Sequence, residues 1–106
     1  MGFMERGTTP THRFVGETDL TGASVLYLSY AQDGKILLEK TIDDVDISYE
    51  NGECVVKVRL TQKETLLFDE HRMVMIQIRV AFPDGTALAS NIIKTSTTSL
   101  LKEGEI

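Results

Sequence analysis

Apolar and polar residues alternate along most of this chain, which is the pattern of β-strands that bury one face and leave the other in water. In residues 54–60 every second residue is apolar, and Lys57 and Arg59 occupy positions between them. Residues 74–82 repeat the pattern with Arg79 on the polar side. The side chains expected to face the core are Leu26, Leu28, Tyr30, Cys54, Val56, Val58, Leu60, Val74, Ile76, Ile78, Val80 and Phe82. Such a period of two predicts antiparallel strands.

Three turn signals separate these runs: Asp33-Gly34, Asn51-Gly52 and Asp84-Gly85. Residues of these types adopt the positive φ angles that a tight hairpin needs. The segment "THRFV", residues 11–15, follows Pro10. We expect it to be an edge strand, because proline cannot continue a hydrogen-bonded ladder. About seven short strands are therefore predicted.

The segment "RLTQKETLLF" interrupts the strand pattern. Thr61 is followed three residues later by Glu64, a capping box in which each side chain satisfies backbone N–H groups of a first helical turn. A sandwich must carry the chain from one sheet to the other between its fifth and sixth strands, and one helical turn near residues 62–67 would do so. We predict an all-β, immunoglobulin-like antiparallel β-sandwich with this single helical corner.

Length and charge narrow the classes of function. A chain of 106 residues predicts a single domain over residues 1–106, with an N-terminal arm at 1–8 and a C-terminal tail at 99–106. A net charge of −5 opposes contact with phosphate backbones, so we expect no nucleic-acid partner. The sequence has no run of about 18 apolar residues and no apolar stretch at its start, so neither a membrane span nor a signal peptide is expected.

The residues that could support chemistry are few. Cys54 could be a nucleophile with His12 or His71 as its base. Its alternation with Val56 and Val58 places the sulfur in the core instead, where a thiol is inert. Both histidines are expected at the surface, and neither has a neighbour at metal-ligand spacing. We predict no catalytic residue, no bound metal and no cofactor.

An acidic cluster comprises Asp43, Asp44 and Asp46. Its carboxylates could bind a hard cation such as Ca²⁺. Val45 and Ile47 alternate with them, so Asp44 and Asp46 are expected to point outward from a strand as a solvated acidic edge, which would also discourage aggregation. We favour the solvated acidic edge over a cation site.

Met73 and Met75 occupy the outward positions of a strand whose inward residues already fill the core. Exposed methionine offers adaptable apolar surface for a protein partner. The alternative is that the corner helix or a terminal segment covers the pair. The edge strand and the apolar C-terminal tail are further candidates for contacts with other chains, and their residues are Thr11, Arg13, Leu100 and Leu101.

Five motifs together carry a resemblance: "GTTPTHRF", "YAQDGKILLEK", "VRLTQKETLLF", "IQIRV" and "DGTALASNI". From Arg6 to about Leu101 the chain resembles small proteins encoded by phages and prophages of Gram-positive gut bacteria. The resemblance implies a phage context near structural or tail genes. It also implies a virion location after synthesis in the bacterial cytoplasm.

The leading hypothesis is a non-enzymatic phage structural or assembly module that contacts copies of itself or other tail, baseplate or capsid proteins. The alternative is a ligand- or carbohydrate-binding module for host attachment. Such modules usually present exposed aromatic side chains, whereas this chain has no Trp and only Tyr27, Tyr30 and Tyr49 among its tyrosines. A regulator of host or phage proteins is a third possibility.

Overall fold

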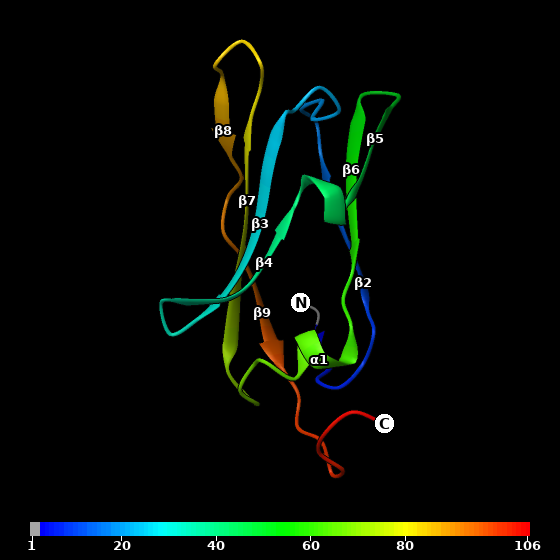
Figure 1. Ribbon diagram of the computed structural model, residues 1–106, viewed down its shortest axis with the longest axis vertical. Coiled ribbons are helices and arrows are strands. Elements are labelled where there is room, and N and C mark those ends of the chain that lie inside the picture. The colour runs from blue at the N-terminus through cyan, green and yellow to red at the C-terminus, as the bar shows by residue number, and fades with distance from the viewer. Residues whose placement is uncertain (1–2) are drawn as a thin grey trace.

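The computed structural model describes residues 3–106, which form nine strands and two short helical segments (Figure 1). The strands are β1 (Phe3–Met4), β2 (Thr11–Gly16), β3 (Val25–Gln32), β4 (Lys35–Thr41), β5 (Asp46–Glu50), β6 (Glu53–Arg59), β7 (Met73–Ala81), β8 (Ala87–Ala89) and β9 (Ile93–Thr97). The helical segments are the 3₁₀ turn η1 (Ile42–Asp44) and the α-helical turn α1 (Gln62–Thr65). Within these residues no helix is long and apolar enough to cross a membrane.

The strands form two sheets that pack face to face. The larger has the order β1-β9-β7-β3-β4, with β8 also paired to β7, and the smaller has the order β2-β6-β5. All neighbours are antiparallel except β1 and β9, which run parallel. The rows β9-β7-β3-β4 and β5-β6-β2 match strands G-F-C-C′ and D-E-B of a variable-type immunoglobulin domain. The chain is therefore an immunoglobulin-like β-sandwich, as the sequence predicts.

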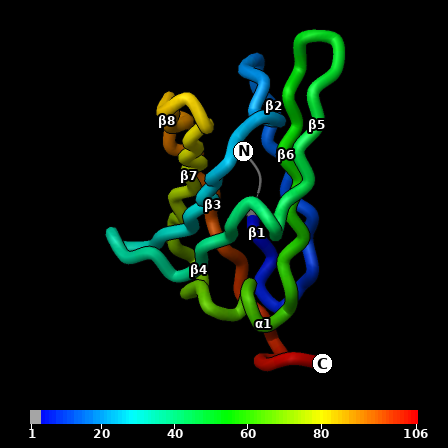
Figure 2. Tube along the Cα trace, turned by 45° about the horizontal axis from the view of Figure 1, so that its top comes forward, coloured from blue at the N-terminus to red at the C-terminus, as the bar shows by residue number. Residues whose placement is uncertain are grey.

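The core lies between the two sheets. Its buried cluster consists of Met4, Leu26, Leu28, Tyr30, Val56, Val58, Leu60, Phe68, Val74, Ile76, Ile78 and Val80. The alternation pattern predicted most of these side chains correctly, and Cys54 is also buried. Phe82 is only half-buried, because β7 has already ended before it. Figure 2 shows the two layers from another side, with β3, β4 and β7 in one and β2, β5 and β6 in the other.

Two of the three predicted turns are confirmed in detail. Both residues of Asp33-Gly34 and of Asn51-Gly52 have positive φ angles, between 51° and 77°. At Asp84-Gly85 only the glycine does, with φ 91°. There the Gly85 N–H donates to the Phe82 carbonyl, and the Phe82 N–H donates to the Thr86 carbonyl. The turn is thus one residue longer than a two-residue Asp-Gly turn.

The sequence predicts a single strand after the Asp84-Gly85 turn, over residues 86–94, but the structure splits it at Ser90 into β8 and β9. The Ser90 hydroxyl accepts a hydrogen bond from the Ile78 N–H (3.0 Å) and donates one to the Asn91 carbonyl (2.9 Å). A side-chain oxygen at this point takes the place of a ladder carbonyl, so β8 ends there. Pairing with β7 resumes only at β9. Side chains that compete with the backbone in this way are hard to foresee from alternation alone.

The predicted helical corner is confirmed. Thr61 Oγ1 accepts from the Glu64 N–H (3.1 Å), and Glu64 Oε1 accepts from the Thr61 N–H (2.9 Å). Helix α1 carries the chain from β6 in the smaller sheet to β7 in the larger one. The buried Thr65 Oγ1 donates to the Thr8 carbonyl (3.0 Å), so the corner also holds the N-terminal segment.

The two terminal segments pack against each other at the lower end of the molecule in Figure 1. Met4 is buried, and its carbonyl accepts from the Thr98 N–H (3.2 Å). Arg6 forms an ion pair with Glu103 (3.0 Å) and donates to the Phe68 carbonyl (2.7 Å). Contacts within the chain therefore join residues 4–6 to residues 98–103 and to Phe68.

Candidate functional site

The outer face of the larger sheet, which points away from the smaller sheet, carries a shallow groove of about 550 Å³. We call it the outer-face groove. Its floor is strand β3, where Ser29 and Ala31 are too small to fill the space between the neighbouring strands β4 and β7. The side chains that line it are Tyr27, Ser29, Ala31, Ile36, Glu39, Met75, Gln77, Arg79 and Ile92.

The strand register sets the walls of the groove. Met75 and Gln77 on β7 lie opposite Ala31 and Ser29, respectively. On the other side the β3–β4 register shifts between Tyr30 and Ala31, so that Ile36 rather than Leu37 lies opposite Ala31. This irregularity turns Ile36 outward and gives the groove its second apolar wall.

Most of the large side chains around the groove are apolar and accessible. Met73, Met75, Tyr27, Ile36 and Ile92 are each between 41% and 55% exposed. Neither α1 nor a terminal segment covers Met73 and Met75 in the part of the chain that the structure describes. Apolar side chains gathered in this way on one sheet face are typical of a surface that contacts another protein.

Charges of both signs border this apolar surface. Glu39 on β4 accepts a hydrogen bond from Ser29 Oγ at 3.4 Å, and Arg79 extends from β7. Lys94 on β9 lies opposite Met75. An apolar centre with a charged border resembles the anatomy of protein–protein interfaces.

Sequence reasoning identified Met73 and Met75 but missed the other apolar members of this surface. Tyr27 could have been found, because it alternates with the inward residues Leu26 and Leu28. Ile36 and Ile92 could not, since their positions depend on the register shift in β4 and on the break after β8.

The other predicted interface residues lie on separate surfaces. Thr11 and Arg13 are exposed on β2, at the edge of the smaller sheet, as the edge-strand prediction requires. Leu101 is fully exposed. Leu100 is half-buried and packs over Gly7, so less of its side chain is accessible than that of Leu101. A role of Leu100 at an interface stays a prediction.

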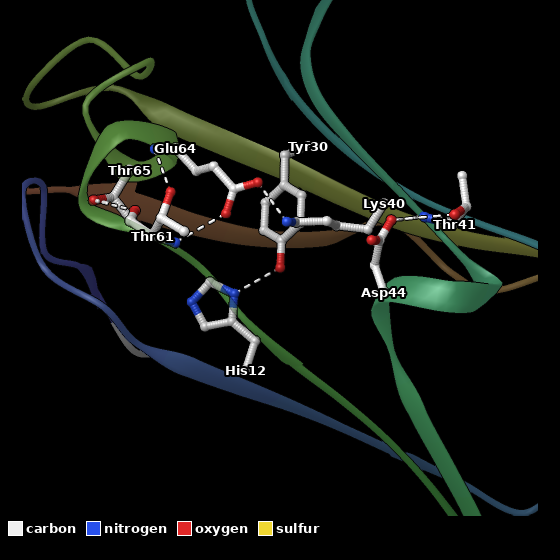
Figure 3. A network of polar contacts seen from close by, with 8 residues as sticks. All are labelled: His12, Tyr30, Lys40, Thr41, Asp44, Thr61, Glu64 and Thr65. Carbon is white, nitrogen blue, oxygen red and sulfur yellow. Dashed lines mark hydrogen bonds and ion pairs between the residues drawn. The ribbon is translucent and has the colours of Figure 1, made fainter.

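A polar network links the two sheets near α1 (Figure 3). His12 Nδ1 on β2 and Tyr30 Oη on β3 are 2.7 Å apart and share a hydrogen bond. The expectation that His12 is a surface residue is therefore wrong, because its ring is half-buried and faces Tyr30. His71, in contrast, is exposed as expected.

Burial sets the protonation of this pair. It raises the pKa of the Tyr30 hydroxyl well above its usual value, and the negative charge of Glu64 adds to the effect. Burial also lowers the pKa of His12 below 6.5. Both side chains are therefore neutral near pH 7, which suits a structural hydrogen bond between the sheets.

Lys40 and Glu64 form a half-buried ion pair beside Tyr30 (Figure 3). Partial burial alone would raise the pKa of Glu64. The hydrogen bonds from Lys40 and Thr61, together with the Lys40 charge, outweigh burial and lower this pKa overall. These contacts hold strand β4 against the helical corner.

The His12 site predicts a pH dependence of folding. Because the pKa of His12 is lower in the folded state than in the unfolded chain, its contribution is complete above pH 6.5 and declines as the pH falls below it. Urea unfolding between about pH 5 and pH 8 measures this slope. Replacing His12→Gln is expected to flatten the slope between about pH 5.5 and pH 8, which lies above the range where the carboxyl groups of Glu64 and Asp44 contribute most. A slope in this range that is as steep in His12→Gln as in the wild type would contradict this assignment.

The acidic cluster is arranged differently from the prediction. Asp44 is not an outward strand residue but closes η1: its Oδ2 accepts from the Thr41 N–H (2.8 Å) and hydroxyl (3.1 Å). The backbone hydrogen bond is the main reason why the pKa of Asp44 is lowered. Asp46 is exposed at the start of β5. Among the described residues no three His, Cys, Asp or Glu side chains are placed to hold a metal ion together.

Cys54 faces the core, as predicted, and is only 2% exposed. We expect its thiol to react slowly with a thiol reagent under native conditions, because the sulfur is shielded and thiol exchange needs an accessible thiolate. Spectrophotometric labelling with and without urea measures this, with rapid reaction expected only in the unfolded chain. Fast native labelling would contradict the placement of Cys54.

Neither a protein-family model nor a curated protein matches this sequence. Among solved structures, the chain is similar to the V domain of amphioxus IgVJ-C2, with 10% sequence identity and a TM-score of 0.36. The match covers 90% of this chain and 97% of that domain.

Proposed function

We propose that this chain is a non-enzymatic module of a phage particle, which docks onto another structural protein through the outer-face groove. The phage setting rests on the five sequence motifs described above. The docking role rests on the groove itself. Together they favour an accessory protein of the tail, baseplate or capsid.

The observation that carries the docking role is the uncovered apolar surface on strands β3, β4 and β7. Its wall residues Tyr27, Ile36 and Met75 each leave more than two-fifths of their surface in water. Taking such a side chain from full exposure to full burial is worth about 1.5–3 kcal/mol, so burying the exposed half of one of them contributes about half of that, before the costs of association. Methionine and tyrosine are also enriched at protein interfaces.

The test is incorporation into particles. Particles would be purified from a lysogen that encodes the chain, with the wild-type protein or with Met75→Asp, and analysed by quantitative mass spectrometry. We expect the wild type to be present and Met75→Asp to be at least about tenfold depleted, because the substitution removes apolar contact area and introduces a carboxylate that would have to lose its water on docking.

His71→Asp is the matched control. It also introduces an acidic side chain, but in the exposed turn before β7, at a residue that does not line the groove. Its incorporation should equal that of the wild type. Absence of the wild-type chain from purified particles would refute the structural role, and equal incorporation of Met75→Asp would refute the groove as the docking site.

The alternative function, binding of a carbohydrate during host attachment, makes a different demand on the same groove. Tyr27 is its one aromatic side chain, and Glu39, Gln77 and Arg79 could hydrogen-bond a sugar. A glycan array would decide between the two. Binding that Tyr27→Ala abolishes would favour the alternative.

A further inference from the structure

Strand β2 is an open edge of the smaller sheet. In the constant-type arrangement this sheet has four strands, A-B-E-D. Here it has the order β2-β6-β5, and no strand of residues 3–106 lies beside β2 on its outer side. The N-terminal strand β1 pairs instead with β9 of the larger sheet. The place of the fourth strand is therefore left open by this chain.

The backbone groups available at this edge can be identified. The Leu60 N–H donates to the Pro10 carbonyl (2.9 Å), in register with the β2–β6 pairs. Hydrogen-bonded pairs alternate along an antiparallel ladder, so residues 12, 14 and 16 bond to β6. The N–H and C=O groups of Thr11, Arg13 and Val15 then point to the open side.

An apolar slot of about 230 Å³ lies next to this edge, between the two sheets. Phe14 and Val15 line it from β2, and Leu88 and Ile93 line it from β8 and β9. Val15, Leu88 and Ile93 are all exposed. Unpaired backbone groups beside exposed apolar side chains make this edge suited to receiving another strand.

We propose that strand β2 pairs antiparallel with β2 of a second copy of this chain, about a two-fold axis at Phe14. This register places Arg13 opposite Val15 of the other copy and Thr11 opposite its Glu17. The outward backbone groups of residues 11, 13 and 15 then meet their counterparts. Two three-stranded sheets become one continuous six-stranded sheet, and the two slots lie together.

Charge and strand length together select this register. Arg13 forms an exposed ion pair with Glu53 of its own chain (3.8 Å). In the dimer it is also a diagonal neighbour of Glu17 in the other copy, and this contact occurs twice, against one diagonal between the two Arg13 side chains. An axis one residue earlier, at Arg13, would place the two Arg13 side chains directly opposite each other, which is unfavourable. An axis one residue later, at Val15, would put Arg13 directly opposite Glu17 but would keep only residues 14–16 of each β2 in the ladder, instead of residues 12–16.

The experiment is the oligomeric state of the full chain, measured by light scattering and sedimentation at increasing concentration. We expect the wild type to form a dimer. Arg13→Glu should weaken dimerisation roughly tenfold or more, since it puts two like-charge pairs in place of two opposite ones. The double variant Arg13→Glu with Glu17→Arg should restore it, because the pair is present again with its signs exchanged.

Two further variants separate this edge from other surfaces. Arg13→Pro removes an N–H that points outward and leaves the β2–β6 hydrogen bonds in place, so it should also give a monomer. Met75→Asp, in the outer-face groove, should leave the dimer intact. The β2 dimer and the docking of the groove onto another protein are therefore tested independently.

A wild type that stays monomeric at high concentration would overturn the inference. So would a dimer that resists both Arg13 variants, or a double variant that fails to dimerise. The double variant also keeps the test decisive if Arg13→Glu alone does not fold.

Discussion

Replacing Phe68 by alanine is expected to lower the free energy of unfolding by about 3–5 kcal/mol, the range for removing a buried aromatic side chain. Phe68 follows α1 and is only 1% exposed. Its ring lies 6.0 Å from that of Tyr30, centroid to centroid, and its carbonyl accepts from Arg6. The substitution would leave a cavity where the corner, strand β3 and the N-terminal segment meet.

Leu67→Ala is the matched control for this prediction. Leu67 is the adjacent residue but is 48% exposed, so its truncation should cost no more than about 0.5 kcal/mol. Urea unfolding followed by circular dichroism measures both variants. Similar losses for Phe68→Ala and Leu67→Ala would mean that the corner is not anchored through Phe68.

Gly7→Ala is expected to cost about 2–3 kcal/mol, which is more than the same change at Gly34. Both glycines have positive φ angles, 71° and 75°, so a side chain at either position costs about 1–2 kcal/mol. At Gly7 the new Cβ would also lie 2.8 Å from Leu100 Cδ1, so the end of that side chain would have to move, which adds up to about 1 kcal/mol. At Gly34 no atom of the described chain lies within 4 Å.

A double substitution identifies the source of the difference. If Leu100 causes the extra cost at Gly7, the substitution Gly7→Ala should lower the free energy of unfolding less in a Leu100→Ala background than in the wild type. The loss in that background should be about the loss caused by Gly34→Ala in the wild type. Thermal unfolding of the wild type and the four variants, Gly7→Ala, Gly34→Ala, Leu100→Ala and the double variant, provides the comparison. Equal losses at Gly7 and Gly34 would show that Leu100 does not restrict a side chain at position 7.

Some of this architecture follows from local patterns in the sequence. Alternation placed Leu26, Leu28 and Cys54 inside because a strand turns successive side chains to opposite faces, whatever its partner is. The cap at Thr61 and Glu64 was predictable because all of its atoms lie within one turn of chain. The outward positions of Met73 and Met75 follow from the same alternation.

The remainder was decided by contacts between residues that are distant in sequence. His12 looks like a surface residue until β2 is placed across from Tyr30, and only the packing of the two sheets does that. Ile36 joins the outer-face groove through a register shift, which depends on how β4 fits β3. The open edge at β2 exists because β1 pairs with the other sheet. Alternation tells which side of a strand is apolar, but it carries no information on which strands become neighbours, because that choice depends on how all the apolar faces are buried together.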